Sequence, residues 1–235
     1  MKKVNFFFLI LALCFTNTLS LMTLKKLKIE NIKIYGSELF SKEDIVENSS
    51  LDLSTRLIFV KTKLIEKELK QNLTLEKISV SRQILPFGLR VLIKTRTPVA
   101  YGERILKGKK LAGYVDQYGY FIDQKNTEKV NLNKFKLRVF GWKDDFKKTL
   151  SIIIASQMKN EVDLIKISFS ENGFLTLEEQ DLKTIYLGFD PKLISSQIQI
   201  ISNLKNQLIK NNLSRGFDKI DLTDPKNPII KVFKP

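Results

Sequence analysis

Several short motifs in this sequence carry residues that could do chemistry, and each lacks a feature that its chemistry needs. Residues 102–110, GERILKGKK, bring glycines and lysines together as a phosphate-binding loop does. However, five residues separate Gly102 from Gly108 where the P-loop has four, and no serine or threonine follows the lysines. Residues 202–205 read S-x-x-K as in penicillin-recognising enzymes, but no S-D-N or K-T-G motif accompanies them. We therefore predict a basic turn and a helix face at these two places.

The amino-acid composition removes most other catalytic and metal-binding possibilities. The 235 residues include no histidine and one cysteine, Cys14. This excludes Ser-His and Cys-His catalysis, histidine or cysteine zinc sites, iron–sulfur clusters and disulfides within the chain. The acidic pairs Asp144–Asp145 and Glu178–Glu179 are typical of a helix start and a turn. We expect no enzyme activity, no cofactor, no metal site and no small-molecule substrate.

The chain is hydrophobic enough to fold and strongly basic. Hydrophobic residues make up 43% of it and charged residues 28%, which excludes disorder. Its 40 Lys and Arg against 25 Asp and Glu give a net charge of +15, which favours anionic partners. Residues 134–136 and 146–148 set aromatic side chains among lysines, as nucleic-acid sites can. We expect no nucleic-acid partner, because an exported chain does not meet the chromosome.

Residues 1–24 are predicted to enter a membrane. Two lysines precede an uncharged stretch at residues 4–22, which is close to the length that crosses a bilayer core. We expect one uncleaved anchor, with the N-terminus in the cytoplasm and the bulk of the chain outside. Two alternatives stay open. One is a cleaved signal peptide, although residues 18–20 fit the cleavage pattern poorly. The other is a lipoprotein signal at Cys14, although a bulky leucine stands where a small residue is expected.

Residues 25–98 show a β-α-α-β-β pattern. Alternating apolar residues at 27–34 predict a strand. Ser41 and Asp44 predict a capping box for a short helix, and Thr62 is expected to cap a second helix. Alternating residues on both sides of Pro86-Phe87-Gly88 predict a β-hairpin.

Residues 99–235 predict a second domain, mixed, antiparallel and β-rich with two helices, so the whole chain is expected to be α+β. Asp144 or Asp145 is expected to cap the first helix. Asp190 as cap and Pro191 at the first position are expected to open the second, which runs to about Lys210. Strands are expected at residues 100–104, 111–115, 119–122, 162–169, 174–177, 184–187, 219–222 and 229–233.

The closing strand is the feature that most directly indicates a function. It consists of Ile229, Ile230, Lys231, Val232 and Phe233, and the sequence ends two residues later. At a sheet edge, the unpaired N–H and C=O groups of such a strand can bind a partner's strand. An inner or capped strand is the open alternative.

The order of elements and several short motifs resemble the FtsQ/DivIB family of bacterial division proteins. The motifs are IKIYG at 32–36, SKEDI at 41–45, TRTPVA at 95–100, YVDQYG at 114–119, LG at 187–188 and IDL at 220–222. The last four are similar to the family's E-R-x-P-x-A, V-D-x-x-G, L-G and V-D-L-R. Thr95 and Thr223 depart from this pattern, since the family has glutamate and arginine there.

The resemblance implies a membrane anchor at residues 1–24, a POTRA domain at 25–98 and the family's β domain at 99–235. It implies a non-enzymatic, single-pass scaffold of the plasma membrane, located at the division septum, that helps recruit or regulate septal peptidoglycan synthesis. In the family, small coiled-coil proteins of the FtsB/DivIC and FtsL type add a strand to the terminal strand of the β domain. The matching residues here are Asp221, Leu222, Ile229, Ile230, Lys231, Val232 and Phe233.

A second, weaker contact is predicted on the POTRA hairpin, whose first strand is expected to be an edge. Its residues are Ile78, Val80, Arg82 and Ile84. The alternative function is an envelope-assembly POTRA protein that handles outer-membrane or secreted polypeptides. A wall-binding module that holds anionic polymer by its basic charge is a further alternative, and its binding would depend strongly on salt.

Overall fold

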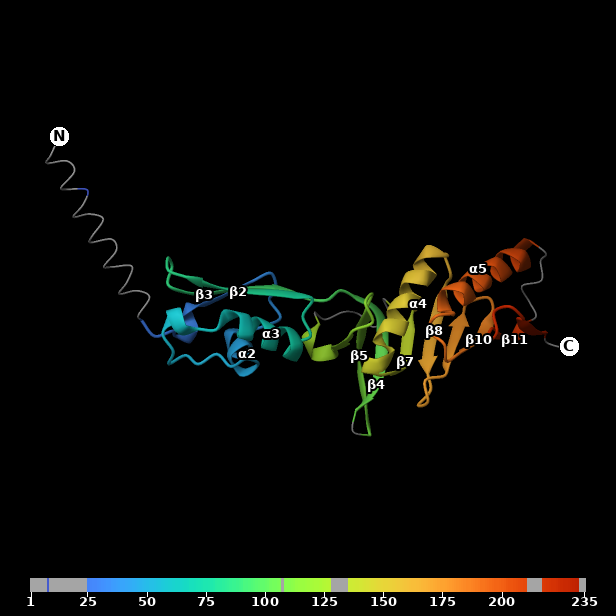
Figure 1. Cartoon of the computed structure of the whole chain (residues 1–235), viewed down its shortest axis with the longest axis horizontal. Helices are drawn as coiled ribbons and strands as arrows, with labels where there is room; N and C mark the ends of the chain where they lie inside the picture. The colour runs from blue at the N-terminus through green and yellow to red at the C-terminus, as the bar shows by residue number, and fades with distance from the viewer. Residues whose placement is uncertain (1–7, 9–24, 107, 128–134, 211–216, 233–235) are drawn as a thin grey trace. The chain divides into compact units, whose positions relative to one another are not determined.

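The computed structural model describes residues 8, 25–106, 108–127, 135–210 and 217–232 (Figure 1). The predicted anchor at residues 1–24 lies outside this part of the chain, except for Phe8. Among the described residues, no helix is both long enough and apolar enough to cross a membrane. The chain divides into two compact units, Met1–Arg96 (unit 1) and Thr97–Pro235 (unit 2). The sequence places this boundary at Pro98, the first residue of a strand of unit 2.

Unit 1 is a three-stranded sheet with two α-helices. Its elements are η1 (Ile29–Asn31), β1 (Ile32–Tyr35), α2 (Lys42–Glu47), η2 (Leu57–Phe59), α3 (Thr62–Asn72), β2 (Lys77–Gln83) and β3 (Gly88–Lys94). The strand order is β1-β3-β2, with β1 parallel and β2 antiparallel to β3. This confirms the β-α-α-β-β order that the sequence predicts.

Local signals explain most of unit 1, with two corrections. Ser41 Oγ accepts the N–H of Asp44 at 3.1 Å and the Asp44 carboxylate accepts the N–H of Ser41 at 2.7 Å, so the capping box is confirmed. The prediction that Thr62 caps α3 is wrong, because Lys61 holds that position and no side chain caps it. The strand expected at 27–34 is shorter, because the N–H of Asn31 closes a 3-10 turn by donating to the carbonyl oxygen of Lys28 at 2.9 Å. The Asn31 side-chain oxygen in turn accepts the N–H of Lys28 at 3.1 Å.

Unit 2 is a nine-stranded sheet with two α-helices. Its strands are β4 (Pro98–Leu106), β5 (Lys109–Asp116), β6 (Phe121–Asp123), β7 (Arg138–Trp142), β8 (Leu164–Phe169), β9 (Leu175–Glu179), β10 (Lys183–Gly188), β11 (Phe217–Asp221) and β12 (Ile229–Val232). The helices are η3 (Gln124–Asn126), η5 (Asp144–Phe146), α4 (Lys147–Lys159) and α5 (Ile194–Lys210). The strand order is β12-β11-β10-β9-β8-β7-β4-β5-β6.

The α+β class is confirmed for the described residues, but the expectation of antiparallel pairing is wrong at several places. β4–β7, β7–β8 and β10–β11 are parallel pairs, as is β1–β3 in unit 1. For β7–β8 and β10–β11 the cause is a helical crossover, because α4 connects β7 to β8 and α5 connects β10 to β11. A helix that returns the chain across the sheet lets the next strand run in the same direction.

Both helix starts predicted in unit 2 are also wrong. Asp144 and Asp145 belong to η5, and α4 begins three residues after Asp144 at Lys147. Asp190 accepts the N–H of Lys192 at 2.9 Å in a separate turn ahead of Ile194, the first residue of α5. The end of α5 at Lys210 is where the sequence places it.

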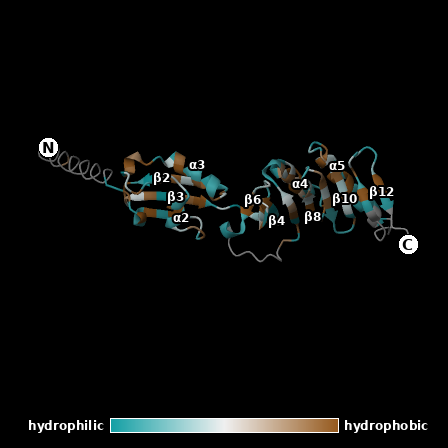
Figure 2. Cartoon of the chain, turned by 90° about the horizontal axis from the view of Figure 1, so that it is seen from below, coloured by the Kyte–Doolittle hydropathy of each residue, from teal (hydrophilic) through white to brown (hydrophobic). Residues whose placement is uncertain are grey.

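The two helices of unit 2 pack on each other and share one core with the sheet (Figure 1). Ile153 of α4 and Ile198 of α5 are both completely buried. Figure 2 shows apolar and polar segments side by side in helices and strands, as expected of amphipathic elements with one buried face. Trp142 is buried in this core, and its Nε1 donates a hydrogen bond to the carbonyl oxygen of Gly119 at 2.9 Å.

Candidate partner-binding edge

The predicted binding strand lies at one end of the unit 2 sheet. Among the described residues, β12 has a single neighbouring strand, β11, with which it pairs antiparallel. In an antiparallel pair, every second residue directs its N–H and C=O away from the partner strand. The four residues of β12 therefore present main-chain donors and acceptors at a sheet edge.

The two faces of β12 differ in character. Ile230 lies opposite Ile220, which is completely buried, so Ile230 is on the core face and is 37% exposed. Ile229 and Lys231 are on the opposite, open face, because alternate residues of a strand share a face. The Ile229 side chain is 58% exposed. Val232 is the last described residue of β12, and the predicted site residue Phe233 lies outside the described residues.

A hollow of about 300 Å³ lies on the open face next to β12. Its lining residues are Phe174, Tyr186, Lys219, Asp221, Thr223, Ile229 and Lys231. The Nζ atom of Lys219 is 4.7 Å from the centre of the Tyr186 ring, within cation–π distance. A strand added to β12 would thus place its side chains beside a hollow with both aromatic and cationic walls.

Helix α5 holds β11, the strand with which β12 pairs, in place. Nε2 of the buried Gln197 donates hydrogen bonds to the carbonyl oxygens of Leu187, at 2.8 Å, and Leu222, at 2.7 Å. The N–H of Leu222 donates to the carbonyl oxygen of Tyr186 at 2.8 Å. Leu222 is a predicted site residue, but its side chain is completely buried. Its part in the site is therefore to hold β11 in place, because no surface of its side chain is open to a partner.

Asp221 and the turn after it set the path from β11 to β12. The Thr223 hydroxyl and N–H donate to Asp221 Oδ1 at 2.7 Å and 2.9 Å, and these bonds lower the pKa of the Asp221 carboxyl. Asp224 is held in the same way by Asn227, whose side-chain amide donates at 2.8 Å and lowers the pKa of Asp224. Both carboxylates therefore accept local hydrogen bonds that stabilise the turn.

The second predicted site, on β2 of unit 1, is a sheet edge whose main chain is partly occupied. The N–H of Val80 donates to Glu66 Oε1 of α3 at 2.8 Å, and the Val80 side chain is buried. Arg82 donates to the carbonyl oxygen of Val60 at 2.7 Å. Ile78 is half-buried, and Ile84 lies in the turn after β2. At Val80, this edge is therefore closed to a partner's strand by Glu66.

Comparison with known protein families decides what unit 1 is. Residues 27–96 match the family model described as POTRA domain, FtsQ-type, and these residues fold in the β-α-α-β-β order. Residues 27–96 of unit 1 are thus similar to FtsQ-type POTRA domains. The resemblance to FtsQ/DivIB-type POTRA proteins is thereby confirmed. The match ends at the last residue of unit 1 and does not extend into unit 2. No curated protein matches the chain at a significant level.

An FtsQ-type POTRA domain indicates a scaffold role in cell division that works through protein–protein contacts. The residues available for such contacts include several that sequence reasoning missed. Phe174, Tyr186 and Lys219 line the hollow beside β12, yet none was a predicted site residue. Alternation along β10 and β11 places Tyr186 and Lys219 on the open face, but only the sheet order shows that both strands lie next to β12.

Proposed function

We propose that this protein is a non-enzymatic scaffold of bacterial cell division, held in the plasma membrane by residues 1–24, with residues 25–235 outside the cytoplasm. The FtsQ-type POTRA domain supports the division role. The uncharged stretch at residues 4–22, preceded by Lys2 and Lys3, supports the anchor.

In this proposal, β12 receives a strand from another single-pass division protein of the FtsB/DivIC or FtsL type. Main-chain hydrogen bonds along β12 supply affinity, and the open face beside Ile229 and Lys231 supplies selectivity. The protein then helps recruit or regulate septal peptidoglycan synthesis. The observation that carries this proposal is the position of β12 at the end of the sheet, with Ile229 more than half exposed.

Imaging of a fluorescent fusion at Met1 in dividing cells tests the proposal, because this fusion leaves β12 free. We expect a band at the division plane that is lost when residues 229–235 are deleted. A band that survives the deletion would move recruitment away from β12. A uniform membrane signal throughout the cell cycle would contradict the division role and favour the envelope-assembly alternative.

A point substitution separates loss of the contact from loss of the fold. Ile229→Glu places a charge on the open face of β12, where a partner side chain would be buried, and we expect at least a tenfold loss of partner binding, or about 1.4 kcal/mol. The matched control is Met158→Glu, since Met158 is an exposed apolar residue of α4, at 68% exposure. Equal binding by the two variants, with both folds intact, would argue against β12 as the binding strand.

A further inference from the structure

The chain enters the POTRA domain beside a turn that carries exposed apolar side chains. Lys26 forms an isolated antiparallel bridge with Arg56. The N–H of Leu57 donates to the carbonyl oxygen of Lys25 at 3.4 Å, and the N–H of Leu27 donates to that of Thr55 at 3.2 Å. The 3-10 turn η2 is therefore fixed next to Lys25, the residue that follows the predicted anchor.

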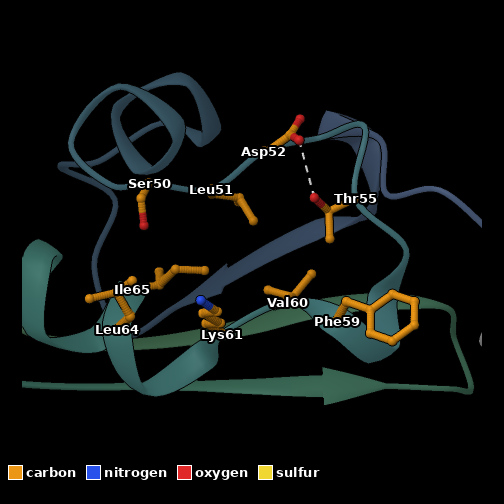
Figure 3. Close-up of a pocket in the computed structure, with 9 residues that line it drawn as sticks. All are labelled: Ser50, Leu51, Asp52, Thr55, Phe59, Val60, Lys61, Leu64 and Ile65. Carbon is orange, nitrogen blue, oxygen red and sulfur yellow. Dashed lines mark hydrogen bonds between the residues drawn. The ribbon is translucent and has the colours of Figure 1, made fainter.

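Two bulky side chains of η2 are exposed although their neighbours are buried. Ile58 is 39% exposed and Phe59 is 62% exposed, whereas Leu57 and Val60 on either side of them are buried in the domain core. Figure 3 shows the Phe59 ring directed away from the other side chains that line the adjacent pocket. Because the buried neighbours fix the turn, Ile58 and Phe59 are held outward as a rigid apolar projection.

The tip of the β2–β3 hairpin lies at the same end of the domain. A Cβ atom at Gly88 would overlap the carbonyl oxygen of Asn31, so the tip lies against η1. The guanidinium of Arg82, near the tip, donates to the carbonyl oxygen of Val60, at the end of η2. At this tip Leu85 is 64% exposed. Ile58, Phe59 and Leu85 therefore project from one end of the domain, the end that also holds Lys25.

Exposed cationic side chains lie on the two segments that the bridge joins, next to η2. Lys25, Lys26, Lys28 and Arg56 are all exposed, and none forms an ion pair within the described residues. Two carboxylates, Glu30 and Asp52, lie among them, and Asp52 is occupied by hydrogen bonds from Ser54. Exposed apolar side chains ringed by an excess of lysine and arginine are typical of a surface that binds anionic membranes.

We propose that Ile58, Phe59 and Leu85, the membrane-proximal surface, insert into the headgroup region of the same anionic bilayer that residues 1–24 enter. The proposal rests on the anchor of the proposed function. Lys25 would then lie at the membrane boundary, and the hydrogen bond from Leu57 to Lys25 keeps η2 within reach of it. The contact would set the orientation of the POTRA domain on the membrane, and so the direction in which the chain leaves toward unit 2.

The test uses the full chain in vesicles with an environment-sensitive fluorophore on a single cysteine. Cys14, the only cysteine, is replaced by serine, and Phe59→Cys or Leu85→Cys receives the fluorophore. The matched control is Leu92→Cys, because Leu92 is an exposed apolar residue of the same domain, at 48% exposure. It lies four residues beyond Gly88 along β3, or about 13 Å from the hairpin tip.

In vesicles of phosphatidylethanolamine and phosphatidylglycerol, we expect the probes at 59 and 85 to shift to the blue and to be quenched by headgroup-proximal spin-labelled lipids. The probe at 92 should keep the emission it has in water. Arg56→Glu should reduce the quenching at 59. Equal emission at 59 and 92 in vesicle-bound protein would overturn the proposal.

Flotation of the same vesicles distinguishes this failure from failure of the proposed function. A chain that does not float with the lipid has no anchor, and the membrane attachment in the proposed function is then contradicted. A chain that floats while the probe at 59 stays in water retains its anchor, and only the membrane-proximal surface is contradicted. Blue shift without any quenching by lipid would identify a protein as the occupant of this surface and would also overturn the proposal.

Discussion

Nε2 of Gln197 lies 2.7 Å from the carbonyl oxygen of Leu222, and this hydrogen bond ties helix α5 to the end of β11. The same amide group donates to the carbonyl oxygen of Leu187 at the end of β10. One buried side chain thus joins the two parallel strands that α5 connects, at the point where the chain turns toward β12. The position of β12 therefore depends on Gln197, whose buried side chain has no surface open to a partner.

Gln197→Ala should destabilise unit 2 by about 1–3 kcal/mol, because the carbonyl oxygens of Leu187 and Leu222 would be left buried without a donor. Urea unfolding measures the change as a lower midpoint. Gln199→Ala is the control, since Gln199 is exposed on the same helix. If the two variants unfolded at the same urea concentration, Gln197 would not be a stabilising link.

Lys205 and Glu179 form a second link between α5 and the sheet, and Lys205→Met should break it. The Nζ atom of Lys205 is 2.8 Å from Glu179 Oε1, and the Glu179 side chain is completely buried. Without the ammonium group, that buried carboxylate loses its counter-charge, which costs about 3–5 kcal/mol. The matched control is Lys192→Met, which removes an exposed charge near the start of α5. A loss below about 1 kcal/mol in Lys205→Met would contradict the role of the pair.

The same pair predicts a pH dependence in alkaline solution. Burial by itself lowers the pKa of Lys205, but the hydrogen bonds from Lys205 to Glu179 and Asp163 outweigh it and raise the pKa above its ordinary value of 10.5. A raised pKa means that the stabilisation is complete below the ordinary value and is lost as the pH rises through the folded-state value. The free energy of unfolding of the wild type should therefore fall above about pH 10.5, more steeply than that of Lys205→Met. Parallel pH profiles would contradict this prediction.

Features that depend on neighbouring residues in sequence were predictable. The capping box of Ser41 and Asp44 and the two hairpins around Pro86 and Gly173 are each set by a few adjacent side chains. The residues at which helices begin were less predictable. At α4, Asp144 and Asp145 sit in a 3-10 turn, and the α-helix begins only after the half-buried Phe146, whose ring stacks on Phe169 at 4.6 Å. Tertiary packing of an aromatic ring outweighed the local capping preference.

The arrangement of strands depends on contacts between distant residues, and the sequence patterns did not reveal it. β4 pairs with β7 and β10 with β11, both in parallel, although β5 and β6 separate the first pair in the sequence and α5 separates the second. The apolar character of β12 was visible, but its place at the end of the sheet follows from the order of all nine strands. For the same reason, Tyr186 was absent from the predicted site although it lines the hollow beside Ile229.

The occupied edge of β2 yields a prediction about unit 1. Glu66→Ala removes the acceptor of the Val80 N–H, so this amide should exchange with solvent faster and the domain should lose about 1.5–3 kcal/mol of stability. Hydrogen–deuterium exchange of the β2 amides measures the first effect. Glu47→Ala, at an exposed position of α2, is the control. Unchanged exchange at Val80 would show that Glu66 does not protect this edge, and β2 would then rival β12 as a binding strand.

The hollow beside β12 yields the sharpest test of how a partner strand is recognised. If a partner side chain enters the hollow, Tyr186→Ala removes part of its wall and should weaken partner binding about tenfold, or 1.4 kcal/mol, while the fold is retained. Thr184→Ala is the matched control, because Thr184 lies two residues away on the same strand and face. Titration of each variant with a candidate partner's extracytoplasmic segment gives the two affinities. A tenfold loss in Tyr186→Ala alone would assign selectivity to the hollow. Equal affinities, combined with a loss in Ile229→Glu, would leave recognition to β12 itself.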